Sequence, residues 1–314
     1  MATRIRRALR HATVLVAIAA TSAGSDAEAA TRGFVALAVP PVNSMQASQA
    51  AIDLNGDGAI DNRFGQVFAT LFGAGLEVDF AGPVLAGEVV YLLRVTSSDP
   101  AFQTDPSARA EWIVGQPTAP VPTDFSGNGS FQIDANYAPG AFTAPLAAAN
   151  FLSANPVTTT APVDVPLQFF LADPFVLGLR GARLTFTVIP GGMTLGQLNG
   201  SISQDDVQAI LIPALATYFN QIVAAGGPDA MTLLALFDDG CAGVGANDGM
   251  ISACEVSDSV VGTLLTPDVD IYADDGSYAP NPANTSPDSL SFGMKFTAAN
   301  AQVPLEVVFA DSFE

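Results

Sequence analysis

Glycine and proline interrupt this 314-residue chain so often that long regular elements cannot form over most of it. The sequence contains 28 glycines and 22 prolines, which separate short runs of β-branched and aromatic residues. Residues 86–96, 166–172 and 181–189 are runs of this kind. Short apolar runs bounded by turn residues are typical of strands in a sandwich or a barrel-like sheet. We therefore predict a mainly β fold with many turns and a few short helices that flank acidic loops.

Apolar residues recur at helical spacing in a few places. The best case follows Ser203, which precedes acidic residues as a helix N-cap does, and continues as one apolar face to residue 223. Pro213 lies inside this run and predicts a kink or two shorter helices. The predicted helices cover about residues 63–71, 203–223, 229–237 and 255–265.

The first 29 residues have the composition of a secretory signal peptide. Four arginines precede a short apolar run, 13–20. Two candidate cleavage sites follow, Thr21-Ser22-Ala23 and Ala27-Glu28-Ala29, and the second fits the A-x-A pattern. The alternative is an uncleaved amphipathic anchor. We predict that residues 1–29 are a signal peptide and that the mature protein is secreted, periplasmic or held at the cell surface. Residues 30–314 are expected to form one β-rich domain, with helical calcium-loop segments at about 45–75 and 203–265.

No later segment contains 18 uninterrupted apolar residues, so we expect no transmembrane segment in the mature chain.

The charge balance limits the kinds of partner that this protein is expected to bind. The chain has 31 acidic and 11 basic residues and a formal net charge of -20, which disfavours nucleic acid and anionic membranes as partners. An excess of carboxylates is compatible with Ca²⁺, which prefers hard oxygen ligands.

The histidine content excludes several kinds of active site. His11 is the only histidine and lies within the predicted signal peptide. A mature chain without histidine cannot form a Ser-His-Asp triad or a histidine-ligated zinc site. The sequence also contains no P-loop, dinucleotide-binding fingerprint or G-x-S-x-G motif. An enzymatic role is therefore the less favoured interpretation, and we predict no catalytic residues.

The clearest metal-binding pattern is residues 53–61, Asp-Leu-Asn-Gly-Asp-Gly-Ala-Ile-Asp. Its alternating oxygen-bearing side chains lie on one side of the chain, and Gly58 permits the sharp turn that a wrapping loop needs. A metal-free polar turn is the alternative. The predicted calcium ligands are Asp53, Asn55, Asp57, Ala59 through its carbonyl oxygen, and Asp61 directly or through water.

This segment resembles an EF-hand loop, and more closely the shortened loops of dockerins and thrombospondin type 3 repeats. The resemblance implies an acidic ligand at the twelfth position, where this sequence has Phe64. Either the affinity for calcium is weak, or an acid from elsewhere in the chain completes the shell of ligands.

A second acidic segment, 238–255, matches only the later half of an EF-hand loop, because its first and third positions have no ligating side chain. Cys241 and Cys254, the only two cysteines, lie within it. Two cysteines in an exported chain favour a disulfide. A disulfide-stapled loop without metal is the alternative. The predicted calcium ligands are Asp238, Asp239, Asp248, Met250 through its carbonyl oxygen, Ser252 and Glu255.

A third acidic stretch, 268–276 followed by Asp288, has a similar density of carboxylates but no regular spacing. It either binds metal or forms a solvated acidic loop. The order of these loops and the C-terminal residues 308–314 resemble a group of uncharacterised exported bacterial proteins with EF-hand or dockerin-like calcium-binding loops. The resemblance implies secretion and calcium binding, and no particular activity.

Together these features predict an exported calcium-binding protein with a structural or surface-binding role, in which Ca²⁺ mainly stabilises the fold. Its expected partners are calcium ions and a cell-surface or extracellular polymer. The alternative is a calcium-stabilised secreted hydrolase that uses an Asp/Glu pair.

Overall fold

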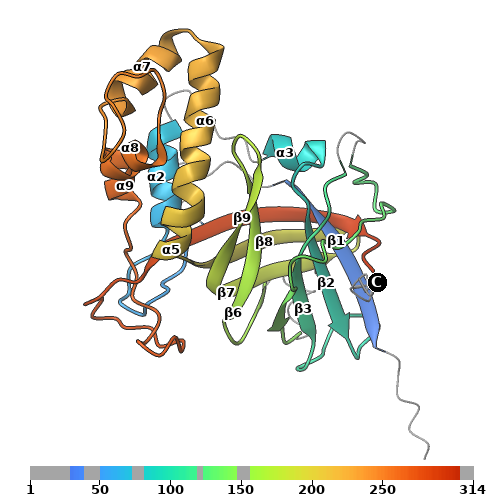
Figure 1. Ribbon diagram of the computed structural model, residues 1–314. Helices are drawn as coiled ribbons and strands as arrows, with labels where there is room; N and C mark the ends of the chain where they lie inside the picture. The colour runs from blue at the N-terminus through green and yellow to red at the C-terminus, as the bar shows by residue number, and fades with distance from the viewer. Residues whose placement is uncertain (1–28, 39–49, 73–80, 119–122, 147–155, 305–314) are drawn as a thin grey trace, which may run out of the picture.

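The computed structural model describes residues 29–38, 50–72, 81–118, 123–146 and 156–304. Within these residues, nine strands form one antiparallel sheet that curls into a half-barrel (Figure 1). The strand order is β4-β3-β2-β1-β9-β8-β7-β5, and β6 also pairs with β7. The strands are β1 (Ala30–Ala38), β2 (Tyr91–Ser97), β3 (Arg109–Val114), β4 (Gly140–Thr143), β5 (Val157–Thr158), β6 (Val163–Phe170), β7 (Pro174–Ile189), β8 (Gly192–Ser203) and β9 (Ser289–Ala301).

The curl of the sheet arises in its longest strands. The pairing of β7 with β8 shifts register between Arg180 and Arg183, and Gly181 between them has a φ of +58°. A bulge bends a strand and increases its right-handed twist. A further shift between Met193 and Gly196 bends β8 against β9. The sheet therefore closes around its own apolar face instead of packing against a second sheet.

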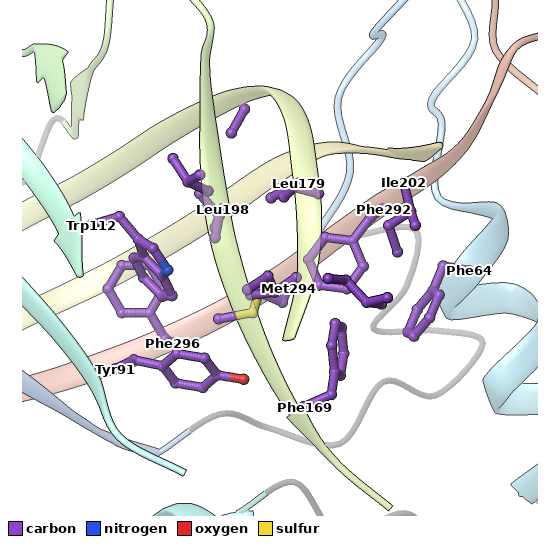
Figure 2. Close-up of a cluster of buried hydrophobic side chains, with 14 of the residues drawn as sticks. Phe64, Tyr91, Trp112, Phe169, Leu179, Leu198, Ile202, Phe292, Met294 and Phe296 are labelled. Atoms are coloured by element: carbon purple, nitrogen blue, oxygen red, sulfur yellow. The ribbon is translucent and has the colours of Figure 1, made fainter. Parts of the chain in front are cut away.

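The concave face of the sheet contains an aromatic core (Figure 2). Phe64, which is fully buried, stacks on Phe68 with ring centroids 4.2 Å apart and meets Phe292 edge-on at 5.2 Å. Trp112 lies 5.5 Å from Phe296, and its indole N–H donates to the Pro166 carbonyl. Phe64 therefore belongs to the core, which explains why no acidic ligand occupies this position.

The helices gather mainly beyond the end of the sheet where the first and second acidic loops lie, and α3 lies near β1 (Figure 1). The predicted helices 63–71 and 229–237 correspond to α2 and α7, and the prediction 255–265 corresponds to two short helices. The helices are α2 (Arg63–Phe72), α3 (Ala81–Ala86), α5 (Gln204–Asp206), the π-helical turn η1 (Val207–Leu211), α6 (Ile212–Ala225), α7 (Pro228–Phe237), α8 (Ala253–Asp258) and α9 (Val260–Leu264).

The helix predicted over 203–223 is present and runs through Pro213 as one continuous stretch, and its hydrogen bonding changes just before the proline. Ser203 caps the helix through its Oγ, which accepts from the Asp206 amide at 3.1 Å. The hydrogen bonding then becomes π-helical over η1, directly before Pro213. A proline has no amide hydrogen and its ring clashes with the carbonyl of the preceding turn, so a regular α-helix cannot continue unchanged through this point.

The continuous helical stretch Gln204–Ala225 is long and apolar enough to cross a membrane when judged by length and composition, with a mean hydropathy of 1.4. The core helix of a soluble protein passes the same test, so this observation supports a membrane span only weakly. Leu211, Leu215 and Phe219 of this stretch are buried in the core of the domain.

The expectation of a mainly β fold with a few short helices is confirmed. Of the two predicted arrangements, the single curled sheet corresponds to the barrel-like one. Both ends of the predicted helical segment 45–75 (residues 45–49 and 73–75), and the predicted signal peptide except its last residue, lie outside the described residues.

We predict that Gly293→Ala destabilises the fold. A Cβ at Gly293 would lie 1.9 Å from the Ala50 carbonyl oxygen and 2.7 Å from Asn199 Oδ1. Because the closer atom belongs to the backbone, the clash cannot be relieved by a side-chain rotation. The free energy of unfolding in urea should fall by about 1–3 kcal/mol. Gly245→Ala is the matched control, since nothing lies within 4 Å of that Cβ; an equal loss in both variants would contradict this account.

Candidate functional site

The side chain of Asp53 organises the first acidic loop. Its carboxylate accepts hydrogen bonds from the amides of Gly56 at 2.6 Å, Asp57 at 3.1 Å and Gly58 at 2.9 Å. Asn55 is buried, and its Oδ1 accepts from the Asp57 amide at 3.1 Å. Both glycines have a φ of +87°, which disfavours residues with a side chain. The sequence therefore winds into a compact turn because its acids bind the amides that follow them.

Asp61 closes this loop in an environment that disfavours its charge. It is 8% exposed, and its Oδ2 accepts from the Leu54 amide at 2.7 Å. Burial raises the pKa of Asp61, and the nearby carboxylates of Asp57, Asp268 and Asp53 raise it further. The loop thus brings negative charges together, and a bound cation would relieve their repulsion.

Asn62 attaches the loop to the sheet. Its buried side chain accepts from the Gly293 amide and donates to the Gly293 carbonyl, both at 3.0 Å. The same Oδ1 accepts from the Gly65 amide at 3.0 Å and so caps the start of α2. One side chain therefore fixes the loop, the helix and β9 relative to one another.

The residue after Asn62 makes a second connection to β9. The Arg63 amide donates to Ser291 Oγ at 2.7 Å, and that hydroxyl donates to Asp268 Oδ2 at 2.6 Å. Leu54 of the loop packs against Val269 in a small apolar cluster. These contacts place Asp268, more than 200 residues away in the sequence, beside the end of the first loop. No local pattern in the sequence marks Asp268 as a partner of this loop.

In the second acidic segment, Asp238 contacts the turn at residues 248–249, ten residues later in the sequence. Its carboxylate accepts from the amides of Asp248 at 3.0 Å and Gly249 at 2.8 Å. Asp248 in turn accepts from the Met250 amide at 2.9 Å. These bonds close residues 239–246 into a loop, and Asp238 and Asp248 come together at its base.

Glu255 is held by donors from the protein itself. It is 1% exposed; its Oε1 accepts from the Gly240 amide at 2.9 Å, and its Oε2 accepts from the amide and hydroxyl of Ser252. Ser252 accepts in return from the Glu255 amide, which completes a capping box at the start of α8. The predicted disulfide between Cys241 and Cys254 is present, with Cα atoms 6.2 Å apart.

Two other predicted ligand residues of the second segment, Asp239 and Met250, are exposed to solvent. The Asp239 side chain is exposed, and Met250 is 64% exposed. The segment is anchored instead by Asn220 of α6, which accepts from the Ile251 amide at 2.9 Å and donates to the Ile251 carbonyl at 2.7 Å. No local sequence pattern identifies Asn220, because it lies 31 residues from Ile251, on a helix whose other residues are mainly apolar.

The third acidic stretch covers the outer face of the sheet next to the first loop. Val269 pairs with Ser289 at the start of β9. The Tyr272 amide donates to Asp288 Oδ2 at 2.8 Å, and the guanidinium of Arg180 lies 3.7 Å above the centre of the Tyr272 ring. The stretch therefore packs on β7 and β9 and is not simply a solvated loop.

In the part of the chain that the structure describes, no group of three or more His, Cys, Asp or Glu side chains is arranged to hold a metal ion. The first loop offers a mixed set of carboxylate, amide and carbonyl oxygens instead, and these hard donors suit Ca²⁺ and not softer metals. No family model, curated protein or solved structure matches this chain.

We predict that Asp61→Asn stabilises the calcium-free protein at neutral pH. The pKa of Asp61 is higher in the folded state than in the unfolded state. Between these two pKa values the native state holds a proton that the unfolded state has lost, so the free energy of unfolding falls as pH rises through this range. Asparagine can still accept from the Leu54 amide but has no charge. In thermal melts with chelator, the variant should melt above the wild type at pH 7.

The difference between the two melting temperatures should vanish near about pH 3.5, where both folded and unfolded carboxyls are largely protonated. Asp173→Asn, in the exposed turn before β7, is the control for a change of net charge. A variant that melts below the wild type by the same amount at both pH values would contradict the assignment.

Proposed function

We propose that this chain is an exported calcium-binding protein with a structural or surface-binding role, in which calcium mainly stabilises the fold. The observation that supports this most is the position of the first acidic loop. The loop gathers mutually repelling carboxylates and is hydrogen-bonded to β9 through Asn62. A cation held there would strengthen a junction between segments distant in the sequence.

The calcium ligands in this proposal are Asp53, Asn55, Asp57, the Ala59 carbonyl oxygen and Asp61, with water. Calcium takes about six to eight oxygens, so five protein ligands leave room in the shell. Asp268 completes it, directly or through water, where the twelfth position has Phe64. Calcium would supply positive charge in this arrangement, and the residues of the chain would supply the preformed turn that receives it.

A second calcium ion in residues 238–255 is a further part of the proposal. Asp238, Asp248, the Met250 carbonyl oxygen and Ser252 would contribute ligands, while Asp239 lies on the exposed insertion. Glu255 could bind the ion only by releasing the amides of Gly240 and Ser252. We therefore expect binding here to be weaker than in the first loop.

Two features support export. The disulfide Cys241–Cys254 is of the kind that persists in oxidising compartments. Strand β1 begins at Ala30, so cleavage after Ala29 would leave the sheet whole. The proposed partner, a cell-surface or extracellular polymer, follows from export and from the sequence resemblance alone.

We predict that calcium raises the melting temperature and that Asp57→Asn removes most of this gain. A ligand that binds only the folded state adds about 2.7 kcal/mol to its stability when the free ligand is about 100 times the Kd. Asp57 is a proposed ligand and also accepts from the Ala59 amide. Asp173→Asn changes the charge equally, outside the loop, and should keep the full response.

Differential scanning calorimetry in calcium and in chelator measures this directly. Magnesium is the control ion, because it demands a tighter octahedral shell. Identical wild-type melting temperatures in calcium and chelator would overturn the proposal.

We also predict that the exported protein begins at Ala30. A signal peptidase requires small side chains at the positions that Ala27 and Ala29 occupy. Expression of the full chain in a bacterial host, followed by intact-mass analysis of the periplasmic fraction and the medium, checks this. A recovered mass that still includes the arginines of residues 4–10 would contradict cleavage.

A further inference from the structure

A cavity of about 660 Å³ lies at the end of β9 that is far from the first acidic loop (Figure 1). That loop is bonded to β9 at Gly293, whereas Asn300 and Ala301 at the other end of the strand line the cavity. Gly293 and Asn300 are about 23 Å apart along the strand, at about 3.3 Å per residue. Charges separated by this distance are largely screened at physiological ionic strength, where the Debye length is about 8 Å. The negative charge of the loop therefore has little effect on what the cavity binds.

Arg32 is the only charged residue among the described residues that line this cavity. Its guanidinium lies over the ring of Phe102, with the Cζ atom 4.6 Å from the ring centre. Phe102 is 2% exposed and does not line the cavity, while its neighbours Ala101 and Gln103 do. The guanidinium therefore lies between a buried ring and the cavity.

The N–H groups of Arg32 have no acceptor among the described residues, although the side chain is partly buried. Other arginines of the sheet and helices are paired: Arg94 with Glu111 at 2.5 Å, and Arg63 with the Leu264 carbonyl at 3.0 Å. A guanidinium presents five N–H donors in one rigid plane, and two of them can bind a carboxylate together. Arg32 therefore offers an anion site that the described protein groups do not fill.

The acidic residues of the neighbouring turn are engaged within that turn. Asp99 accepts from three of its amides, those of Ala101, Gln103 and Thr104. Asp99 does not line the cavity. The same turn holds Phe102 at a φ of +56°, which bulky residues rarely adopt. The turn thus keeps its own carboxylate away from Arg32 and places the aromatic ring beneath the guanidinium.

The part of the wall that comes from the end of β7 is apolar. Val188 is buried, Ile189 is 42% exposed, and Pro190 follows them. Gln103 is exposed and adds an amide group to the wall. A cavity of several hundred Å³ with apolar walls and a few polar groups is typical of a site for a small molecule.

We propose that this cavity binds a small carboxylate ligand with an apolar body. The carboxylate binds Arg32, and the body packs against Val188 and Ile189. Free organic acids and the C-terminal residue of a peptide share this chemistry. The site goes beyond the proposed function, since it needs no metal ion and none of the acidic loops.

The test is a calorimetric titration of the full exported protein in chelator, so that metal binding plays no part. Benzoate represents free organic acids, and N-acetyl-leucine represents a peptide C-terminus. Their uncharged controls are benzamide and the amide of N-acetyl-leucine. At least one carboxylate should bind at least about tenfold more tightly than its amide, because hydrogen bonds between charged partners are stronger than those to neutral groups. The carboxylate that binds identifies the source, and equal binding of each acid and its amide, or no binding of either acid, overturns the proposal.

Arg32→Gln should weaken binding of the carboxylate at least about tenfold and leave binding of the amide unchanged. Arg109→Gln is the matched control, because Arg109 is exposed on β3, does not line the cavity and removes the same charge. If Arg32→Gln fails to fold by circular dichroism, Arg32→Lys is used, since lysine keeps the charge without the planar pair of donors. The preference for acid over amide should then fall. An unchanged titration in the folded variant, or an equal loss in Arg109→Gln, overturns the proposal.

Amide resonances in two-dimensional NMR locate the bound acid. The amides of Gly33, Ala101 and Ala301 in the cavity wall should shift as the carboxylate is added. Those of Gly56 and Gly293, at the first acidic loop, should not shift. Shifts confined to the loop, or absent from the cavity wall, would overturn the assignment.

Discussion

The hydrogen bonds between the buried side chain of Asn62 and the backbone of Gly293 determine where the first acidic loop lies against the sheet. The Asn62 side-chain amide bonds both the backbone N–H and the backbone carbonyl of Gly293 on β9, and Asn62 also caps α2. These hydrogen bonds fix the direction in which α2 leaves the loop, and this direction places Phe64 in the aromatic core. A glycine is needed at position 293 because the chain at Ala50 approaches it too closely for a side chain.

The same junction explains why the sheet has one apolar and one polar buried face near β8 and β9. The core side presents residues such as Phe292, while Ser201, Ser289 and Ser291 lie on the other side and are completely buried. The third acidic stretch covers part of this polar side, since Val269 pairs with Ser289 and Asp268 accepts from Ser291. Burial also raises the pKa of Asp268. The ionised Asp268 carboxylate therefore lowers the stability of the fold, and a bound cation would reduce this loss.

Patterns local in sequence predicted much of this structure, and contacts distant in sequence account for the rest. Apolar spacing predicted α2 and α7, and the two cysteines predicted their bond. Strand β8 was missed, because its glycines and its buried polar residues, such as Ser201, hide the alternation that marks a strand. The pairing of Asn62 with β9 and of Asn220 with the second segment has no local signal, since each joins residues that only the fold brings together.

The central claim is that calcium in the first loop stabilises the junction with the sheet and not the loop alone. Hydrogen exchange by mass spectrometry, in calcium and in chelator, tests it most directly. We predict that calcium slows exchange together in peptides covering residues 50–65, 264–272 and 289–295, because these segments share the hydrogen bonds around Ser291 and Gly293. Protection confined to residues 53–61, or no protection at all, would contradict the account.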